Sequence, residues 1–134
     1  MKNRTTVFLS GILLALGAVP ALAHHSFAAE YDSTKPVMLK GSVTKMEWQN
    51  PHARFYVDVT DEAGKVTNWE FELGSPNGLM RRGWTRNSLK PGDTVTIEGY
   101  LAKDGSKLAN ARNVTLADGR KIFAGAADDG GPSK

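Results

Sequence analysis

Three histidines are the residues of this chain best suited to bind a metal, and they are its whole histidine content. His24 and His25 are adjacent, and His52 directly follows Pro51. If the chain is cut after Ala23, His24 becomes the first residue, and its free α-amine and imidazole Nδ1 close a chelate ring. His52 would add a third nitrogen, whereas His25 would instead add its imidazole and its backbone amide nitrogen. Nitrogen ligands in a tetragonal arrangement suit Cu(II) or Ni(II), and copper usually binds more tightly. The three histidines therefore predict a copper site.

The same histidines allow other interpretations. Zn(II) would usually need a fourth ligand or a water molecule. A histidine pair in a solvated arm can be plain surface, and His52 can serve only to hydrogen-bond the loop Trp48–Asn50. Tyr56 shares a strand face with His52 and could approach an axial position of the metal. Met38 and Met46 could bind Cu(I), although methionine in strands more often fills the core.

Cleavage after Ala23 is expected because residues 1–23 have the three parts of a secretory signal peptide. Lys2 and Arg4 give a positive start, Val7–Val19 is uncharged and mostly apolar, and Ala21–Ala23 places small residues at the cleavage site. The alternative, a membrane anchor, needs about 20 apolar residues. We therefore expect a periplasmic or secreted protein that starts at His24.

Composition excludes several classes of function. The chain has no cysteine, which rules out disulfides, thiolate metal sites and thiol nucleophiles. Loss of Lys2 and Arg4 with the leader lowers the formal net charge from +3 to +1. A nearly neutral chain lacks the basic footprint of a nucleic-acid-binding protein. We expect no nucleic-acid partner, and no membrane span after signal cleavage.

Beyond the leader, the pattern predicts an N-terminal arm over residues 24–36, a β domain over 37–123 and a disordered tail over 124–134. The clearest strand lies at residues 53–59. Its alternate residues Ala53, Phe55, Val57 and Val59 form an apolar face. A turn at residues 61–64 then predicts a hairpin, whose second strand alternates Thr67, Trp69, Phe71 and Leu73 with polar residues.

A short helix is expected after this hairpin. Ser75 is a favoured N-cap, Pro76 is tolerated in the first helical turn, and Gly83 is a suitable C-terminal cap. Two more strands follow at 94–101 and 111–116, with a short add-on containing Ile122 and Phe123. This order predicts a mainly β fold: a small five-stranded OB-like barrel with one short helix between strands 3 and 4. An open sandwich is the alternative.

A second candidate site is a ligand-binding surface made of cationic and aromatic residues. Guanidinium groups beside aromatic rings could hold a carboxylate, a phosphate or a sugar. The residues proposed for it are Arg54, Tyr56, Arg81, Trp84 and Arg86. In the alternative interpretation, Trp84 packs the helix onto the barrel and the arginines near it pair with Glu70 and Glu72.

Motifs for conventional catalysis are absent from the sequence. Ser75 does not lie in a nucleophile elbow, and neither a phosphate loop nor a dinucleotide-binding glycine pattern is found. We therefore expect a non-enzymatic periplasmic protein that holds copper through His24, with His52 or His25. The main alternative is an OB-fold module that binds an anionic or sugar ligand, or an envelope protein, without metal. A redox enzyme built on the copper site is a third hypothesis.

Four segments resemble a family of small exported bacterial proteins of unknown function. They are His24–Phe27, Trp48–His52, Glu72–Asn77 and Arg82–Asp93. The resemblance extends over nearly the whole mature chain. It implies a secreted or periplasmic domain with an OB-like barrel, but it carries no activity and no binding residues.

Overall fold

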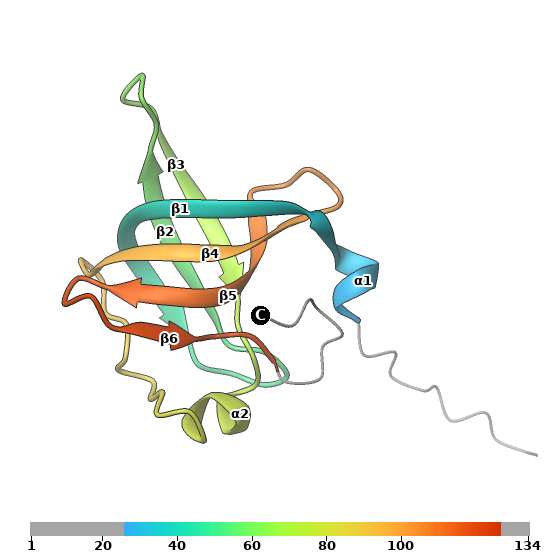
Figure 1. The fold of residues 1–134 in the computed structure, drawn as a ribbon. Coiled ribbons are helices and arrows are strands. Elements are labelled where there is room, and N and C mark those ends of the chain that lie inside the picture. The colour runs from blue at the N-terminus through green and yellow to red at the C-terminus, as the bar shows by residue number, and fades with distance from the viewer. Residues whose placement is uncertain (1–25, 127–134) are drawn as a thin grey trace, which may run out of the picture.

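The part of the chain that the structure describes folds into one six-stranded sheet with two short helices. The structure, a computed structural model, describes residues 26–126. The helices and strands are, in chain order, α1 (Phe27–Glu30), β1 (Tyr31–Glu47), β2 (Arg54–Thr60), β3 (Val66–Glu72), α2 (Pro76–Met80), β4 (Thr94–Ala102), β5 (Leu108–Leu116) and β6 (Lys121–Phe123). The predicted mainly β class is confirmed, and Figure 1 shows the arrangement.

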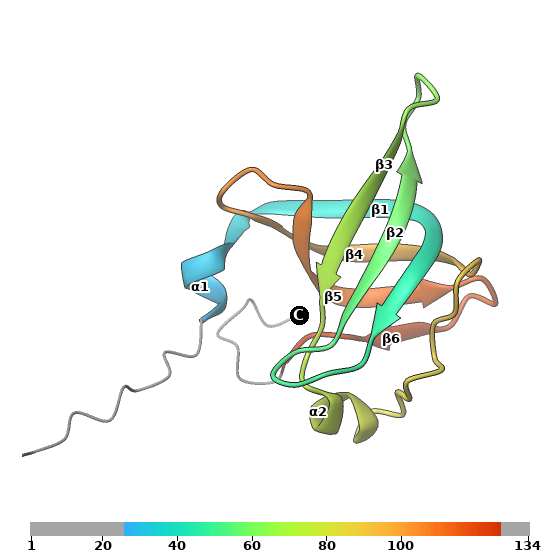
Figure 2. The same cartoon turned by 180° about the vertical axis from the view of Figure 1, so that it is seen from behind.

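The strands are hydrogen-bonded in the order β3-β2-β1-β4-β5-β6, and β3 also pairs with β5. The β3–β5 pairing is parallel and joins Glu70–Glu72 to Leu108–Asn110, whereas the other strand pairs are antiparallel. Because β3 and β5 are joined, strands β1 to β5 form a closed circuit of paired neighbours. Figure 2 shows this circuit from behind, with β3 reaching back to β5.

The long strand β1 connects the two halves of the sheet. Tyr31 and residues 36–42 pair with β4, and residues 42–47 pair with β2. The register shifts between Tyr31 and Pro36 and again between Val43 and Lys45. The strand bends visibly in Figure 1. A Cβ on Gly41 would lie 2.2 Å from the Asp58 carbonyl oxygen, so only glycine fits where β1 crosses from one partner to the other.

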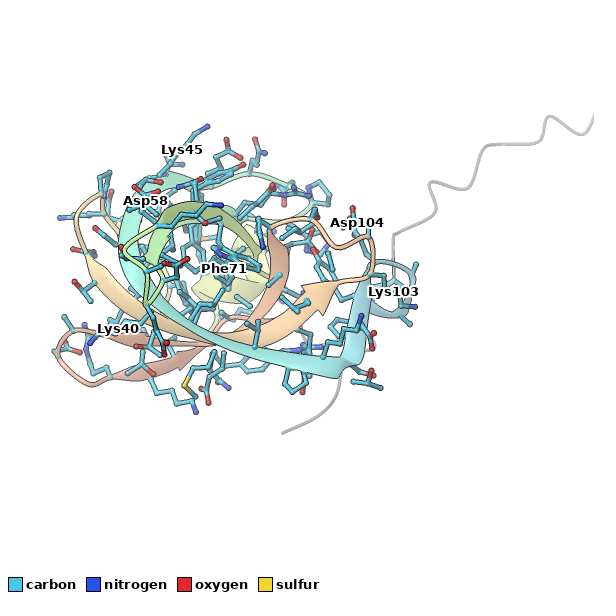
Figure 3. The ribbon with its side chains drawn as sticks, turned by 90° about the horizontal axis from the view of Figure 1, so that it is seen from above. Lys40, Lys45, Asp58, Phe71, Lys103 and Asp104 are labelled. Atoms are coloured by element: carbon cyan, nitrogen blue, oxygen red, sulfur yellow. The ribbon has the colours of Figure 1, made fainter. Side chains whose placement is uncertain are left out.

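The main core lies inside the circuit of strands. The alternation predicted for β2 and β3 is present, because Phe55, Val57, Phe71 and Leu73 are all buried. Seen from above in Figure 3, Phe71 lies inside the curve of the strands, and Lys40 and Lys103 lie at the periphery. The rings of Phe55 and Phe71 stack at 5.2 Å.

The helix α2 begins as the sequence predicted. Ser75 is the N-cap, and its hydroxyl oxygen accepts from the Gly78 amide at 3.2 Å, with Pro76 in the first turn. Trp84 is 1 % exposed and its indole Nε1 donates to the Phe123 carbonyl at 3.0 Å. The indole therefore joins the segment after α2 to β6.

The two ends of the described chain are more ordered than the sequence suggested. Residues 26–36, expected as an arm, contain α1 and the start of β1, with Phe27 and Tyr31 buried in a second small cluster. Ala124, expected to open the tail, is fully buried, and its carbonyl accepts from the Gly74 amide. The apolar rings of Phe27 and Tyr31 pack against β4, which is why this segment docks.

In residues 26–126, neither helix has the length and apolar character that a membrane-spanning helix requires.

Candidate functional site

His52 lies in a groove between the end of β1 and the start of β2. This His52 groove has a volume of about 170 Å³. Its lining is more polar than apolar and consists of Glu47, Gln49, Asn50, Pro51, His52, Arg54 and Tyr56. The peptide bond between Asn50 and Pro51 is cis, which turns the chain from β1 into β2.

The His52 ring is held by the end of β3. Its Nδ1 lies 3.0 Å from the Leu73 carbonyl oxygen, and its side chain is 28 % exposed. Since a carbonyl oxygen can only accept a hydrogen bond, Nδ1 must carry the proton. Nε2 then carries the lone pair of the neutral ring, as in most metal-binding histidines whose other nitrogen donates to a carbonyl. The alternative in which His52 bonds only the Trp48–Asn50 loop is wrong, because its partner is Leu73, which directly follows β3.

Glu72 is a buried carboxylate beside this ring. It is 7 % exposed, and its Oε1 lies 4.0 Å from His52 Nδ1. Burial raises the pKa of the Glu72 carboxyl and Glu30 raises it further, whereas His52 and Arg54 act in the opposite direction. Sequence reasoning placed Glu72 on a solvated face, and the structure corrects this.

Arg54 forms ion pairs with two acidic residues of β3. Its guanidinium donates to the Glu70 carboxylate through Nη1, and its Nη2 donates to Glu72 Oε2 at 3.2 Å. The sequence alternative gave these carboxylates to the arginines after α2. Arg82 instead donates to the Gly125 carbonyl at 2.6 Å and lies over the Phe123 ring at 4.4 Å.

Tyr56 occupies the far end of the His52 groove. Its hydroxyl donates to Glu47 Oε2 at 3.3 Å, and Lys45 Nζ lies 5.4 Å from the centre of its ring. Lys45 also pairs with Glu47. The charged groups along the groove are therefore already paired with one another.

The helix α1 covers the other side of Glu72. The Phe27 ring lies 5.6 Å from the rings of Tyr31 and Tyr100, and the Arg112 guanidinium lies 4.9 Å from it. Burial together with the negative charge of Glu72 holds the pKa of the Tyr31 hydroxyl far above its usual range. That hydroxyl is buried beside Glu72, and among residues 26–126 it has no partner at normal hydrogen-bond distance. Glu72 therefore lies between the segment that starts at Ser26 and the ring of His52.

The five residues proposed as a ligand-binding surface do not form one surface. Arg54 and Tyr56 line the His52 groove. Trp84 is buried in the core, and Arg81 and Arg86 are exposed on the segment after α2. Trp84 thus has the packing role that the alternative interpretation gave it.

His24 and His25 lie outside the residues that the structure describes. Within residues 26–126, the acidic and histidine side chains form no group of three or more that is arranged to hold a metal ion.

A comparison with known protein families identifies the group to which the chain is related. The model of a family of unknown function, DUF6152, matches residues 12–111. The chain belongs to this family. The matched region includes all three histidines, Arg54 and Glu72. No curated protein matches the chain.

The structure contains a group of buried polar residues that the sequence analysis did not predict. Its members are Tyr31, Glu72, Asn110 and Arg112. Glu72 and Asn110 are direct partners in the parallel β3–β5 pairing, and Tyr100 faces Asn110 from β4. All four residues are less than a tenth exposed. No local pattern could have revealed them, because their burial depends on α1 covering the outer side of the sheet.

Proposed function

We propose that the exported chain is a periplasmic, non-enzymatic protein that holds one copper ion through His24 and His52. Its task would be to carry, buffer or sense copper. The single observation that carries the proposal is the hydrogen bond from His52 Nδ1 to the Leu73 carbonyl, at 3.0 Å. It leaves Nε2 in a fixed position, where it can act as a nitrogen ligand for a metal that is also held by His24.

The docked start of the described chain supports the same proposal. His24 is two residues before Ser26, so its Cα is within about 7 Å of that of Ser26, since an extended chain advances at most about 3.6 Å per residue. Glu30 and Tyr31, four and five residues after Ser26, both act on Glu72, whose Oε1 lies 4.0 Å from His52 Nδ1. The first residues of the described chain and His52 thus meet at the same carboxylate.

We also propose that the closed circuit of β1 to β5 is an OB-like barrel. The parallel β3–β5 pairing and the position of α2 between β3 and β4 support it. The rival function, capture of an anion by Arg54 in the same groove, is less well supported because Arg54 already pairs with Glu70 and Glu72.

The test is a Cu(II) titration of the exported chain, followed by electron paramagnetic resonance. Mass spectrometry first establishes whether the chain starts at His24. We expect one copper ion per chain and a nitrogen-rich spectrum. Adding one alanine before His24 removes the terminal chelate but keeps both side chains. Mutation of a group that only hydrogen-bonds to a metal ligand typically lowers metal affinity roughly 10- to 100-fold. Because the added alanine removes a ligand itself, it should weaken copper binding by at least this factor.

Substitutions separate the possible ligands. His52→Ala should weaken binding to a similar extent, whereas Gln49→Ala, in the same groove, should not. If His52→Ala binds as tightly as the wild type and His25→Ala does not, the copper is held by the terminal dipeptide alone. That outcome would remove the proposed role of the fold.

A further inference from the structure

A cationic surface lies on the segment that contains α2 and continues to β4. Between Glu72 and Asp93 the chain carries four basic residues and no acidic one. All four are exposed, and they are Arg81, Arg82, Arg86 and Lys90. In the rest of the described chain acidic residues outnumber basic ones, so positive charge is concentrated in this segment. Figures 1 and 2 show the segment at one end of the molecule, next to β6.

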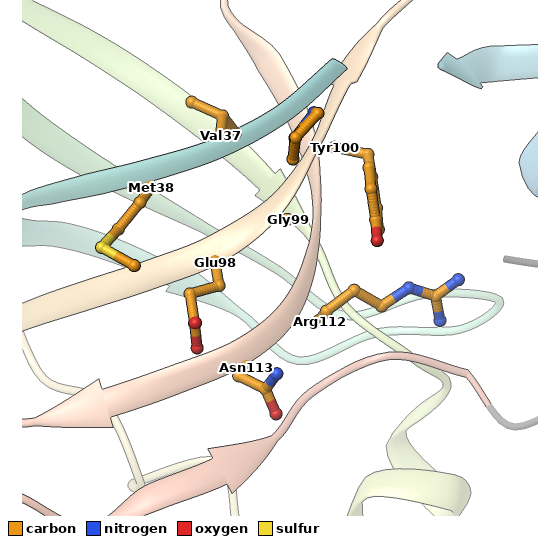
Figure 4. A pocket seen from close by; sticks show the side chains of 8 residues that line it. Val37, Met38, Glu98, Gly99, Tyr100, Arg112 and Asn113 are labelled. Carbon is orange, nitrogen blue, oxygen red and sulfur yellow. The ribbon is translucent and has the colours of Figure 1, made fainter. Parts of the chain in front are cut away.

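Most of this surface has no counter-charge among the described residues. Elsewhere, cations and anions neutralise each other. Lys121 Nζ, for example, lies 2.6 Å from the carboxylate of Glu98. Glu98 lines a groove of about 380 Å³ that crosses β1, β4 and β5 and is called the outer groove here (Figure 4). Within residues 26–126, by contrast, no ion pair involves the side chains of Arg81, Arg86 and Lys90.

Buried anchors hold the cationic surface in place. Leu79, Trp84 and Leu89 alternate with the basic residues and are each at most 1 % exposed. Arg82 also fixes the segment, because its guanidinium donates to the Gly125 carbonyl. The remaining cations are therefore displayed from a backbone that is packed against the core.

One exposed apolar side chain lies beside these cations. Met80 ends α2, is 51 % exposed and directly precedes Arg81. Basic residues next to an exposed apolar side chain suit the boundary of a lipid bilayer, where phosphates meet acyl chains. A protein partner would need a larger apolar centre in the interface than Met80 provides.

We propose that the cationic surface binds the surface of an anionic lipid bilayer. Arg81, Arg86 and Lys90 contact the headgroup phosphates, and Met80 reaches the boundary with the acyl chains. A bilayer suits separated cations because its attraction adds up over them, at about fivefold in affinity for each basic residue. The chain lies on the bilayer and does not cross it. This surface is independent of the copper proposal.

The test measures co-sedimentation of the exported chain with vesicles, in the absence of copper. One set of vesicles contains phosphatidylglycerol and phosphatidylcholine in equal parts, and the other contains phosphatidylcholine alone. We expect binding to the anionic vesicles only. Raising the salt from about 0.1 M to about 1 M should release the chain, because the Debye length falls to roughly 3 Å.

Two double variants with the same loss of net charge locate the binding surface. Arg81→Gln with Arg86→Gln should weaken binding to the anionic vesicles about 25-fold. Lys65→Gln with Lys107→Gln removes two exposed cations that precede β3 and β5, and should weaken it by less than about twofold. Arg82 is left unchanged because it holds Gly125.

Two methionine variants test the apolar contact. Met80→Gln should weaken binding to the anionic vesicles severalfold, because a polar side chain gains nothing at the acyl boundary. Met38 is 65 % exposed on β1, in the outer groove. Met38→Gln should leave vesicle binding unchanged.

Four results would overturn the proposal. Equal losses in the two double variants would mean that net charge alone attracts the chain to lipid. Equal binding to both sets of vesicles would exclude a role for the cations, and wild-type binding by Met80→Gln would exclude the apolar contact. Binding to polyglutamate, but not to the anionic vesicles, would assign the surface to an acidic protein.

Discussion

Two grooves among the described residues differ in their polarity. In the His52 groove, Arg54 pairs with Glu70 and Glu72, and Lys45 pairs with Glu47. The outer groove crosses β1, β4 and β5, where the exposed Met38 lies beside Glu98, which is paired with Lys121. Because the charges of the His52 groove are paired, a ligand there would gain little from charge alone and more from a directed interaction such as coordination to a metal. A ligand of the outer groove would gain mainly from burying apolar surface.

The grooves also differ in what maintains their shape. Ion pairs between side chains hold the walls of the His52 groove, whereas close backbone contact forms the floor of the outer groove. The His52 groove should thus respond to changes of charge. The outer groove should respond to changes of volume at glycine.

The largest effect is expected for Gly99→Ala. The new Cβ would meet the Asn110 carbonyl oxygen at 1.9 Å, which forces β4 and β5 apart. We expect a loss of about 3 kcal/mol or more in the free energy of unfolding, measured by urea denaturation. Gly119→Ala is the control, because its Cβ would meet no atom within 4 Å and only its φ of +86° is unfavourable. That control should cost about 1 kcal/mol. Equal losses in the two variants would show that the backbone contact does not matter.

A smaller loss is expected when the buried ion pairs of the His52 groove are broken. Arg54→Met removes the partner of Glu72, which is 7 % exposed. The uncompensated carboxylate should lower the free energy of unfolding by about 2 kcal/mol near neutral pH. Lys45→Met breaks the exposed pair with Glu47 and should cost less than about 1 kcal/mol. If the two losses are equal, the burial of Glu72 has no energetic consequence.

The smallest effect is expected at Tyr31, which lies between α1 and Glu72. The pKa of its hydroxyl is raised in the folded chain, first by burial and then by Glu72. In the unfolded chain the Tyr31 hydroxyl ionises near pH 10. The contribution of Tyr31 to folding stability is therefore fully present below that pH and is lost as the pH rises above it. In Tyr31→Phe the part of the decrease in the free energy of unfolding above pH 10 that is due to Tyr31 should disappear. Urea denaturation at several pH values measures this.

Near neutral pH the same variant should change the free energy of unfolding by no more than about 1 kcal/mol, since among the described residues the hydroxyl has no partner at normal hydrogen-bond distance. A loss well above this would mean that Tyr31 donates to Glu72 in solution.

Much of the fold was predictable because its signals are local. The apolar alternation of β2, the turn before β3 and the Ser75–Pro76 start of α2 each depend on neighbouring residues only. The packing role of Trp84 was also foreseen, as one of two interpretations. The candidate site was less accessible to such reasoning. His52 was identified from its residue type, but its hydrogen-bond partner at Leu73 is 21 positions away in sequence.

The sequence by itself determined the strand pattern, the polar and apolar faces of β2 and β3, the cap of α2 and the three histidines on which the copper proposal rests. These features follow from periodicity and residue type, which act over a few residues. Only the tertiary structure decided that Glu72 is buried, that Phe27 and Tyr31 dock over it, and that Arg112 is the extra residue of a bulge in β5. Each of these depends on the parallel pairing of β3 with β5 or on a bulge. Such pairing joins residues as far apart as Glu72 and Asn110, and no short stretch of sequence specifies it.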